Sequence, residues 1–310
     1  FGGTGAVILA NNTDGLNFSD NTFNVTGDSI VSTAGLSGLL TVSNNTCTSD
    51  SKMNLQNATL NNLSSISGWD GASGIDLDGV SNLTIQDSEI IDSGSGLEIA
   101  GASSNITLSN IHMVRAGDIS FWVRETSSNI IFNRCFAIDG ITDGFDFNNS
   151  ANNVTLNYCG ALRCGKDRLS TASGDGFSAH DTCSNIIMNY CWGIYNNISG
   201  VAHVGSSSGE MNNCTFINNQ ERDYKDNSGA VLSGRGEIYI TVTGGSGWVI
   251  NNCLAVNTKQ SVFDGSFGVT GHKLAYLKNN AYFTVSNSTF ISDLGYDDDL
   301  FVYGNGETVG

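Results

Sequence analysis

A nearly identical seven-residue phrase recurs along this chain at an almost constant interval. Asn82, Asn105, Asn129 and Asn153 each open it, 23, 24 and 24 residues apart, and Asn185 opens a fifth copy 32 residues later. The phrases read NLTIQDS, NITLSNI, NIIFNRC, NVTLNYC and NIIMNYC. A fixed period of about 20 to 50 residues is typical of repeat architectures, in which each repeat buries its apolar face only against its neighbours.

Each repeat predicts short strands and no helix. Apolar and polar residues alternate over about four positions, as in a half-buried strand, and an Asn or Ser turn follows. Such strands, repeated about every 23 residues, predict an all-β, single-domain right-handed parallel β-helix, a solenoid of roughly eleven coils. We expect this domain to span residues 1–310, with irregular terminal coils over 1–50 and 255–310.

The positions one, three and six residues after each opening Asn are apolar or small, which predicts that they face the interior of the tube. At the sixth position a column of cysteines develops, and we interpret it as buried free thiols that act as small apolar residues. Cys164 and Cys183 flank the longest coil and form either a disulfide or two further free thiols. The column consists of Cys135, Cys159, Cys191, Cys214 and Cys253.

A polar side chain recurs four residues after the opening Asn. Stacked about 4.8 Å apart, amide side chains can hydrogen-bond along the axis, so this column predicts an Asn ladder. The alternative is that Asn is simply common in turns. The column consists of Gln86, Ser109, Asn133, Asn157, Asn189, Asn212 and Asn251.

Composition restricts the partners of the chain. It has 30 acidic and 13 basic residues among 310, a net charge of −17, which argues against nucleic acid because phosphate binding needs clustered Lys and Arg. The sequence contains no run of 18 apolar residues, so it predicts no membrane span. Self-association of the rods into a surface assembly stays open.

Thirteen Asn-X-Ser/Thr sequons favour a secreted or cell-surface protein. The alternative is that Asn turns followed by Thr-containing strands create sequons incidentally. The six positions that we predict to carry glycan are Asn82, Asn105, Asn153, Asn197, Asn213 and Asn287.

The coil between Asn153 and Asn185 is about eight residues longer than its neighbours and is rich in titratable groups. A loop that extends from a rigid solenoid is a common place for a functional site. Lys166, Arg168 and His180 are the candidates for a catalytic base, because burial and neighbouring charges can tune each of them.

Parallel coils place equivalent residues about 5 Å apart, so Asp143 and Asp146 should lie one coil from Asp175 and Ser178, on the face of His180. The three aspartates together predict a Ca²⁺ site. An alternative is that each Asp only caps a turn before Gly. The candidate substrate-binding residues are Arg163, Arg124, Trp122 and Tyr190.

This combination suits an acidic polysaccharide. Eliminating across a uronate needs a base, a group that neutralises the carboxylate and a proton donor for the leaving oxygen. Hydrolysis is the other route and needs two carboxylates across the scissile bond, about 5 to 9 Å apart.

At the level of coil pattern, most of the chain resembles the pectate-lyase-like superfamily of right-handed β-helices. Residues 174–197 also resemble the catalytic module of bacterial mannuronan C5-epimerases, whose Tyr-Gly-Phe-Asp-Pro-His-Asp segment carries the chemistry. The matching residues are Gly176, Phe177, His180 and Asp181, whereas Asp175, Ser178 and Ala179 stand where that family has Tyr, Asp and Pro.

A second local resemblance is to polysaccharide lyase family 9, in which two Asp-Gly-aromatic segments bind Ca²⁺ beside a catalytic Lys. Asp175-Gly176-Phe177 and residues 142–146 are similar to those segments in reversed order, and His180 would occupy the position of the Lys.

Together these features predict an extracellular enzyme, a lyase or an epimerase, acting on an acidic uronate polymer. The alternative is a non-catalytic, glycosylated cell-surface or filament-forming structural or adhesive rod. A third possibility is a carbohydrate-binding module that uses the outward aromatic residues Trp122, Tyr158, Tyr190 and Trp192.

Overall fold

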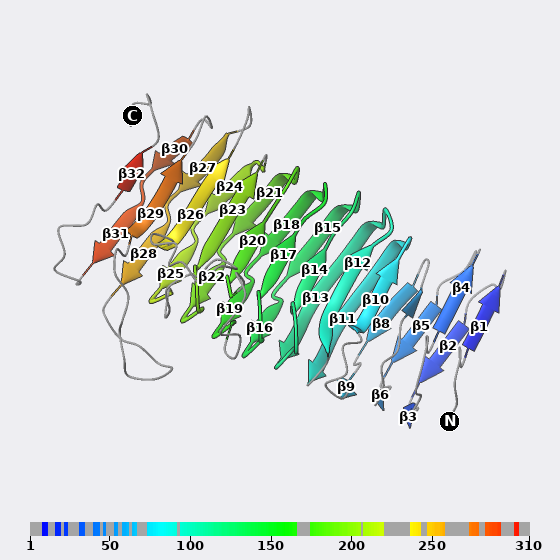
Figure 1. Cartoon of the computed structure of the whole chain (residues 1–310). Coiled ribbons are helices and arrows are strands. Elements are labelled where there is room, and N and C mark those ends of the chain that lie inside the picture. The colour runs from blue at the N-terminus through cyan, green and yellow to red at the C-terminus, as the bar shows by residue number, and fades with distance from the viewer. Residues whose placement is uncertain are drawn as a thin grey trace, which may run out of the picture.

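The chain folds into a stack of parallel strands, as seen in a computed structural model (Figure 1). The structure describes the backbone of the strands between residues 8 and 66. It also describes residues 73–91, 94–165, 174–205, 207–219, 236–242, 247–257, 273–278, 283–292 and 301–303. Every regular element in these ranges is a β-strand. Within them, no helix is long and apolar enough to cross a membrane.

One face of the stack is a nine-stranded parallel sheet to which successive coils each add one strand (Figure 1). Its strands are β10 (Ser73–Asp78), β12 (Ser95–Ala100), β14 (Phe121–Val123), β17 (Phe145–Phe147), β20 (Phe177–Ala179), β23 (Val201–Gly205), β26 (Gly236–Val242), β29 (Lys273–Lys278) and β32 (Phe301–Tyr303). Towards the N-terminus, the three strands β1 (Ile8–Asn11), β4 (Val31–Ala34) and β7 (Met53–Asn54) form a separate parallel sheet.

The rest of each coil forms two further strands joined at a bend. In β11 (Ser81–Ile91) and β13 (Ser104–Val114) the strand passes through the bend without a break. Later coils divide there, into β15 (Ser128–Asn133) and β16 (Phe136–Ile138), β18 (Asn152–Asn157) and β19 (Gly160–Leu162), β21 (Ser184–Asn189) and β22 (Trp192–Ile194), β24 (Gly209–Asn212) and β25 (Thr215–Ile217), β27 (Trp248–Asn251) and β28 (Leu254–Asn257), and β30 (Phe283–Ser286) and β31 (Thr289–Ser292).

The N-terminal coils follow the same plan. Their strands are β2 (Leu16–Ser19), β3 (Thr22–Phe23), β5 (Leu40–Ser43), β6 (Thr46–Cys47), β8 (Ala58–Asn61) and β9 (Ser64–Ile66). β8 and β9 pair in parallel with β11, so this end joins the main stack. The all-β, parallel β-helix fold predicted from the repeat is therefore confirmed.

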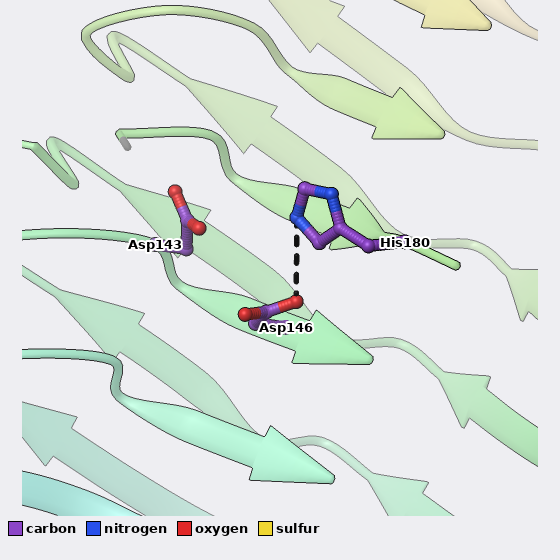
Figure 2. A group of neighbouring side chains, drawn as sticks. All are labelled: Asp143, Asp146 and His180. Atoms are coloured by element: carbon purple, nitrogen blue, oxygen red, sulfur yellow. Dashed lines mark ion pairs between the residues drawn. The ribbon is translucent and has the colours of Figure 1, made fainter. Parts of the chain in front are cut away.

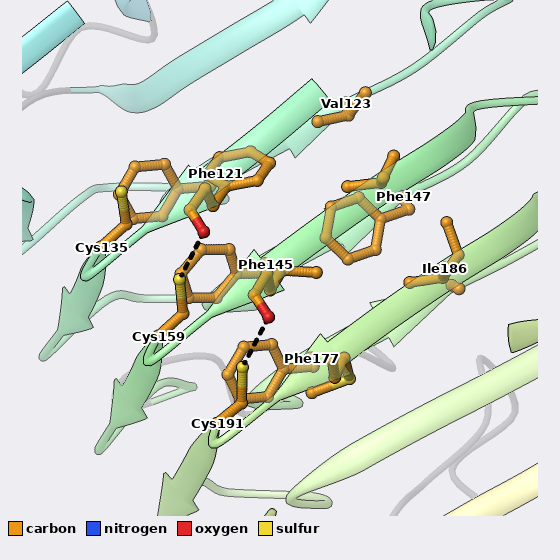
Figure 3. Close-up of a cluster of buried hydrophobic side chains, with 14 of the residues drawn as sticks. Phe121, Val123, Cys135, Phe145, Phe147, Cys159, Phe177, Ile186 and Cys191 are labelled. Atoms are coloured by element: carbon orange, nitrogen blue, oxygen red, sulfur yellow. Dashed lines mark hydrogen bonds between the residues drawn. The ribbon is translucent and has the colours of Figure 1, made fainter. Parts of the chain in front are cut away.

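Inward columns fill the tube as predicted (Figure 3). Phe121, Phe145 and Phe177 stack on successive coils, with ring centroids 4.6 and 4.9 Å apart. The thiols of Cys159 and Cys191 donate to main-chain carbonyls one coil away, at 3.5 and 3.6 Å. The interior of the tube thus combines a column of aromatic rings with a column of small thiols. Large and small side chains can therefore interdigitate.

All five cysteines of the predicted column are buried and free, which confirms that prediction. Cys164 and Cys183 are free as well. The structure therefore has two free thiols at these positions, and the alternative of a disulfide between them is wrong. Burial raises the pKa of each of these two thiols to about 12.

The predicted Asn ladder is also present. Asn157 Nδ2 donates to Asn133 Oδ1 at 3.0 Å, and Asn189 Nδ2 donates in turn to Asn157 Oδ1 at 3.0 Å. Asn212 continues the ladder to Asn189 at 3.2 Å. These residues are half-buried, so each amide satisfies its neighbour where water has little access.

The opening asparagines form a second, exposed ladder that the sequence analysis did not predict. Asn105, Asn129, Asn153 and Asn185 each donate to the residue one coil earlier, at 3.3, 3.4, 3.4 and 2.7 Å. All have φ between 51° and 57°, a left-handed conformation that Asn tolerates better than most residues. The left-handed backbone therefore favours Asn at this position.

The exposed ladder bears on the glycosylation predictions. The amides of Asn105 and Asn153 are ladder donors, and Asn213 accepts from Asn252 in a neighbouring turn. Asn197 is only 5% exposed, which makes its amide less accessible than the exposed positions, and it stays a prediction. The exposed positions, Asn82 and Asn287 included, stay predictions.

Candidate functional site

The site is built on the outer face of the nine-stranded sheet, where three-residue strands project one side chain each. Asp146 is the middle residue of β17, between the inward Phe145 and Phe147. The strand register places Ser178 of β20 on one side of it and Trp122 of β14 on the other. The predicted one-coil relation between Asp146 and Ser178 is therefore confirmed.

Asp143 lies in the turn that leads into β17. Its Oδ1 accepts hydrogen bonds from the main-chain N–H groups of Gly174 and Asp175, at 2.6 and 2.7 Å. These bonds tie the end of the inserted loop to the preceding coil. Oδ1 of Asp143 therefore bonds the next coil and not the turn before Gly144, and its other oxygen, Oδ2, lies 3.5 Å from the Ser178 hydroxyl.

His180, Ser178 and Asp146 form a connected group (Figure 2 shows two of them with Asp143). The Ser178 hydroxyl donates to Asp146 Oδ1 at 3.0 Å and lies 3.0 Å from His180 Nε2. The same Nε2 lies 3.5 Å from Asp146 Oδ1. Since the single hydroxyl proton goes to Asp146, Nε2 must be the donor toward Ser178, and the lone pair of the neutral ring is on Nδ1.

The two carboxyl groups differ from His180 in exposure. Asp143 and Asp146 are each 5% exposed, whereas a third of the His180 side chain is open to solvent. Burial is the main cause that raises the pKa of Asp146 to about 6, against the lowering effect of His180. Burial and the charges of Asp175 and Asp146 hold the pKa of Asp143 well above its usual range.

Three of these groups are close enough to share a cation. Ligand atoms of Asp143, Asp146 and His180 all lie within 4.8 Å of one another. Asp175 was predicted as the third ligand but is not part of this group, and it acts on Asp143 through its charge and its main-chain N–H. The carboxylate oxygens fit Ca²⁺, which takes oxygen ligands, whereas a cation on Nε2 would need the other tautomer of His180.

Two of the predicted substrate-binding residues lie one coil before Asp146. Arg124 forms an ion pair with Glu98 of β12, and its guanidinium stands 4.6 Å above the ring of Trp122. Glu98, Trp122 and Asp146 are neighbours in one outward row. Arg124 therefore supplies a partly exposed positive charge beside an otherwise acidic row.

The structure does not bring Arg163 or Tyr190 to this cluster. Arg163 makes a two-point ion pair with Asp139, at 2.6 and 2.9 Å, in the turn after β16 and β19. Tyr190 stands at the bend between β21 and β22 and stacks on Tyr158. Lys166 and Arg168 lie outside the described residues.

Sequence reasoning assigned no role to Glu98, and it placed Ser178 beside Asp146 without giving it a role. The signal was available, because Glu98, Asp146 and Ser178 occupy the same place in SGLEI, DGFDF and DGFSA. The alignment of these second-half phrases places the three residues in one row. The hydrogen bonds among them could not be read from the phrases.

Comparisons with known proteins agree on the fold. The family described as the right handed beta helix region matches residues 6–166. No curated protein sequence matches the chain.

Similar solved structures share little sequence with the chain. The catalytic domain of Agl-KA superposes with a TM-score of 0.55 at 13% identity, covering 97% of this chain and 60% of that one. The chain thus spans less than two thirds of that domain. The A-module of the Azotobacter vinelandii mannuronan C-5 epimerase AlgE4 gives 0.46 at 11% identity, over 99% and 91% of the two chains. The pectate lyase Pel9A gives 0.42 at 15%, over 88% and 68%.

Proposed function

Because the chain belongs to the right-handed β-helix family, whose coils can present a row of side chains to an extended polymer, we propose that it is an extracellular polysaccharide-active protein. Within that class we propose a lyase or an epimerase that acts on uronate polymers at Asp146, Ser178 and His180. One observation carries the proposal. His180 is partly exposed, and Ser178 and Asp146 hold its Nε2, so that Nδ1 is the basic nitrogen.

A base held in this way suits proton abstraction next to a carboxylate. Nδ1 takes the C5 proton of a uronate, the C4–O bond breaks, and a C4=C5 double bond forms. The imidazolium returns its proton to the leaving oxygen, so charge and atoms balance. In epimerisation the C4–O bond stays intact, water donates a proton to the other face of C5, and the imidazolium releases its proton to the hydroxide that forms. Asp146 stabilises the imidazolium through the 3.5 Å contact with Nε2.

The carboxylates of the site would repel a uronate unless they are neutralised. Asp143 and Asp146 would hold a Ca²⁺ ion through their oxygens, and the ion would neutralise the substrate carboxylate and the charge that develops at C5. Because Ca²⁺ prefers oxygen ligands, this arrangement leaves His180 free for proton transfer. Arg124 offers a second positive charge one coil away.

Hydrolysis has less support. The nearest carboxylate oxygens of Asp143 and Asp146 lie within 4.8 Å, which is shorter than the separation of about 5 to 9.5 Å that glycoside hydrolases use. Both groups are also almost fully buried, so neither flanks an accessible bond.

The test is ultraviolet absorbance of the unsaturated product, with alginate, pectate and glucuronan as substrates, in Ca²⁺ and in EDTA. Epimerisation is followed in parallel as deuterium uptake at C5 by NMR. We expect activity on one polymer that depends on Ca²⁺ and is lost in His180→Ala. His112→Ala, a partly exposed His at another face, is the matched control and keeps full activity.

Activity that survives in His180→Ala would contradict the assignment of the base. Equal activity in Ca²⁺ and in EDTA would contradict the proposed Ca²⁺ site. No product and no deuterium uptake on any of the three polymers would favour the second candidate. That candidate is a non-catalytic surface rod. It is supported by the burial of both carboxylates and by the hydrogen bonds through which Asp143 joins successive coils.

A further inference from the structure

Four aromatic side chains gather at another part of the same coils, around the bend between β18 and β19 and between β21 and β22. Tyr158 and Tyr190 are the bend residues, each about half exposed, at 52% and 50%. Their rings are parallel within 8°, with centroids 4.9 Å apart. Exposed aromatic rings of this size on a soluble protein mark a contact surface more often than isolated apolar residues do.

Trp192 extends this surface on the far side of the bend. A Cβ built on Gly160 would come within 2.2 Å of the Trp192 ring, and its three nearest neighbours all belong to the fused ring system. The indole therefore lies across the bare backbone of Gly160, with Phe136 stacked beside it at 5.9 Å. Trp192 is partly exposed in this position. We call these four residues, Phe136, Tyr158, Tyr190 and Trp192, the aromatic patch.

From this arrangement we infer that the aromatic patch is a second, non-catalytic binding surface for a polysaccharide chain. Rings fixed by stacking and by close backbone contact lose little freedom on binding, and they offer flat apolar faces to the C–H faces of sugar rings. The tyrosine hydroxyls add hydrogen-bonding groups at the edge of the patch.

The charge of the molecule favours a glycan over a second copy of the chain. Two copies would each carry a net charge of −17, and this repulsion opposes association through a small patch. Stacking of a sugar ring on an aromatic ring involves no net charge, so a neutral polysaccharide avoids this repulsion, whereas an acidic one has to overcome it. The inference goes beyond the proposed function, because the aromatic patch and His180 lie on different faces of the coils and each can be removed without touching the other.

The chain itself supplies fold-compatible substitutions for each column. Tyr158 and Tyr190 have φ of 57° and 55°, and the equivalent bend residues Asn110, Asn213 and Asn252 have 55°, 56° and 52°. Tyr158→Asn and Tyr190→Asn therefore keep a residue that tolerates this conformation. Trp192 pairs in register with Thr215, which makes Trp192→Thr the natural replacement.

The experiment is affinity electrophoresis in native gels that contain alginate, pectate or hydroxyethylcellulose. We expect one polymer to retard the wild type, and we expect Tyr190→Asn and Trp192→Thr each to raise the Kd by about threefold to tenfold. Tyr195→Asn is the matched control, since Tyr195 also has φ of 55° and lies in a column where Asn218 follows it. His180→Ala should bind as the wild type does.

Three results would overturn the inference. The first is no retardation in any of the three gels. The second is retardation that His180→Ala abolishes and the patch variants keep, which would place all binding at the candidate site. The third is a dimer in sedimentation velocity that Tyr190→Asn dissociates, because the occupant of the patch would then be a second copy. Loss of catalysis in His180→Ala with retained binding would support both proposals separately.

Discussion

Asp146 is the residue whose titration links the site to stability. Its pKa is raised from 3.8 to about 6, mainly by burial, so the protonated carboxyl stabilises the folded state below about pH 4. That contribution is lost as the pH rises through 6, and its full size is on the order of 3 kcal/mol. Asp146→Asn removes the titration. We expect the drop in unfolding free energy between pH 4 and pH 8 to be about 2–3 kcal/mol smaller in the variant than in the wild type.

Urea unfolding at the two pH values, in EDTA, measures this difference. Asp181→Asn is the control, because Asp181 is an exposed carboxylate in the adjacent turn. It should show the pH dependence of the wild type. If Asp146→Asn did so too, the buried carboxyl would not be the group that titrates.

At the residue scale, the repeat predicted correctly that Asp146 and Ser178 lie side by side on successive coils. Placing Asp143 and Asp146 one coil from Asp175 and Ser178 needed only the period and the strand spacing. The hydrogen-bond directions needed coordinates. Whether Asp175 or His180 joins the two carboxylates depends on side-chain orientations within a turn, and the aligned sequence does not specify these orientations.

Asn157 shows how a single element is secured to its neighbours. It donates to Asn133 and accepts from Asn189, so Asn157→Ala leaves two half-buried amide groups without their partner. We expect a loss of about 2–3 kcal/mol in unfolding free energy, measured by urea denaturation. The comparison is Asn153→Gly in the exposed ladder. Gly keeps the left-handed backbone at φ 51° and water replaces the lost bonds, so the cost should stay below about 1 kcal/mol. Equal losses in both variants would mean that burial does not decide the strength of the ladder.

At the element scale, the alternation of apolar and polar residues predicted the strands of each repeat and the side chains that face inward. It did not predict that β11 and β13 pass through the bend unbroken while β15 and β16 are divided. The pattern of inward and outward residues continues through the bend in both cases, so it does not separate the unbroken strands from the divided ones. The exposed ladder was missed for a related reason. Asn at the opening position was interpreted as a turn signal, and its φ is not visible in the sequence.

For the molecule as a whole, the thiol column reports how the stack opens. In a solenoid each coil contacts only its neighbours, so local opening should begin towards the ends and reach the middle last. Cys253 lies in one of the last described coils, whereas Cys159 lies between described coils on both sides. Under mild denaturant, we expect iodoacetamide to label Cys253 before Cys159, with peptide mass spectrometry as the readout. Full denaturation, which exposes all eight cysteines, provides the control. Simultaneous labelling of the two thiols would show instead that the coils open as one cooperative unit, in which case Asn157→Ala would accelerate labelling at every position alike.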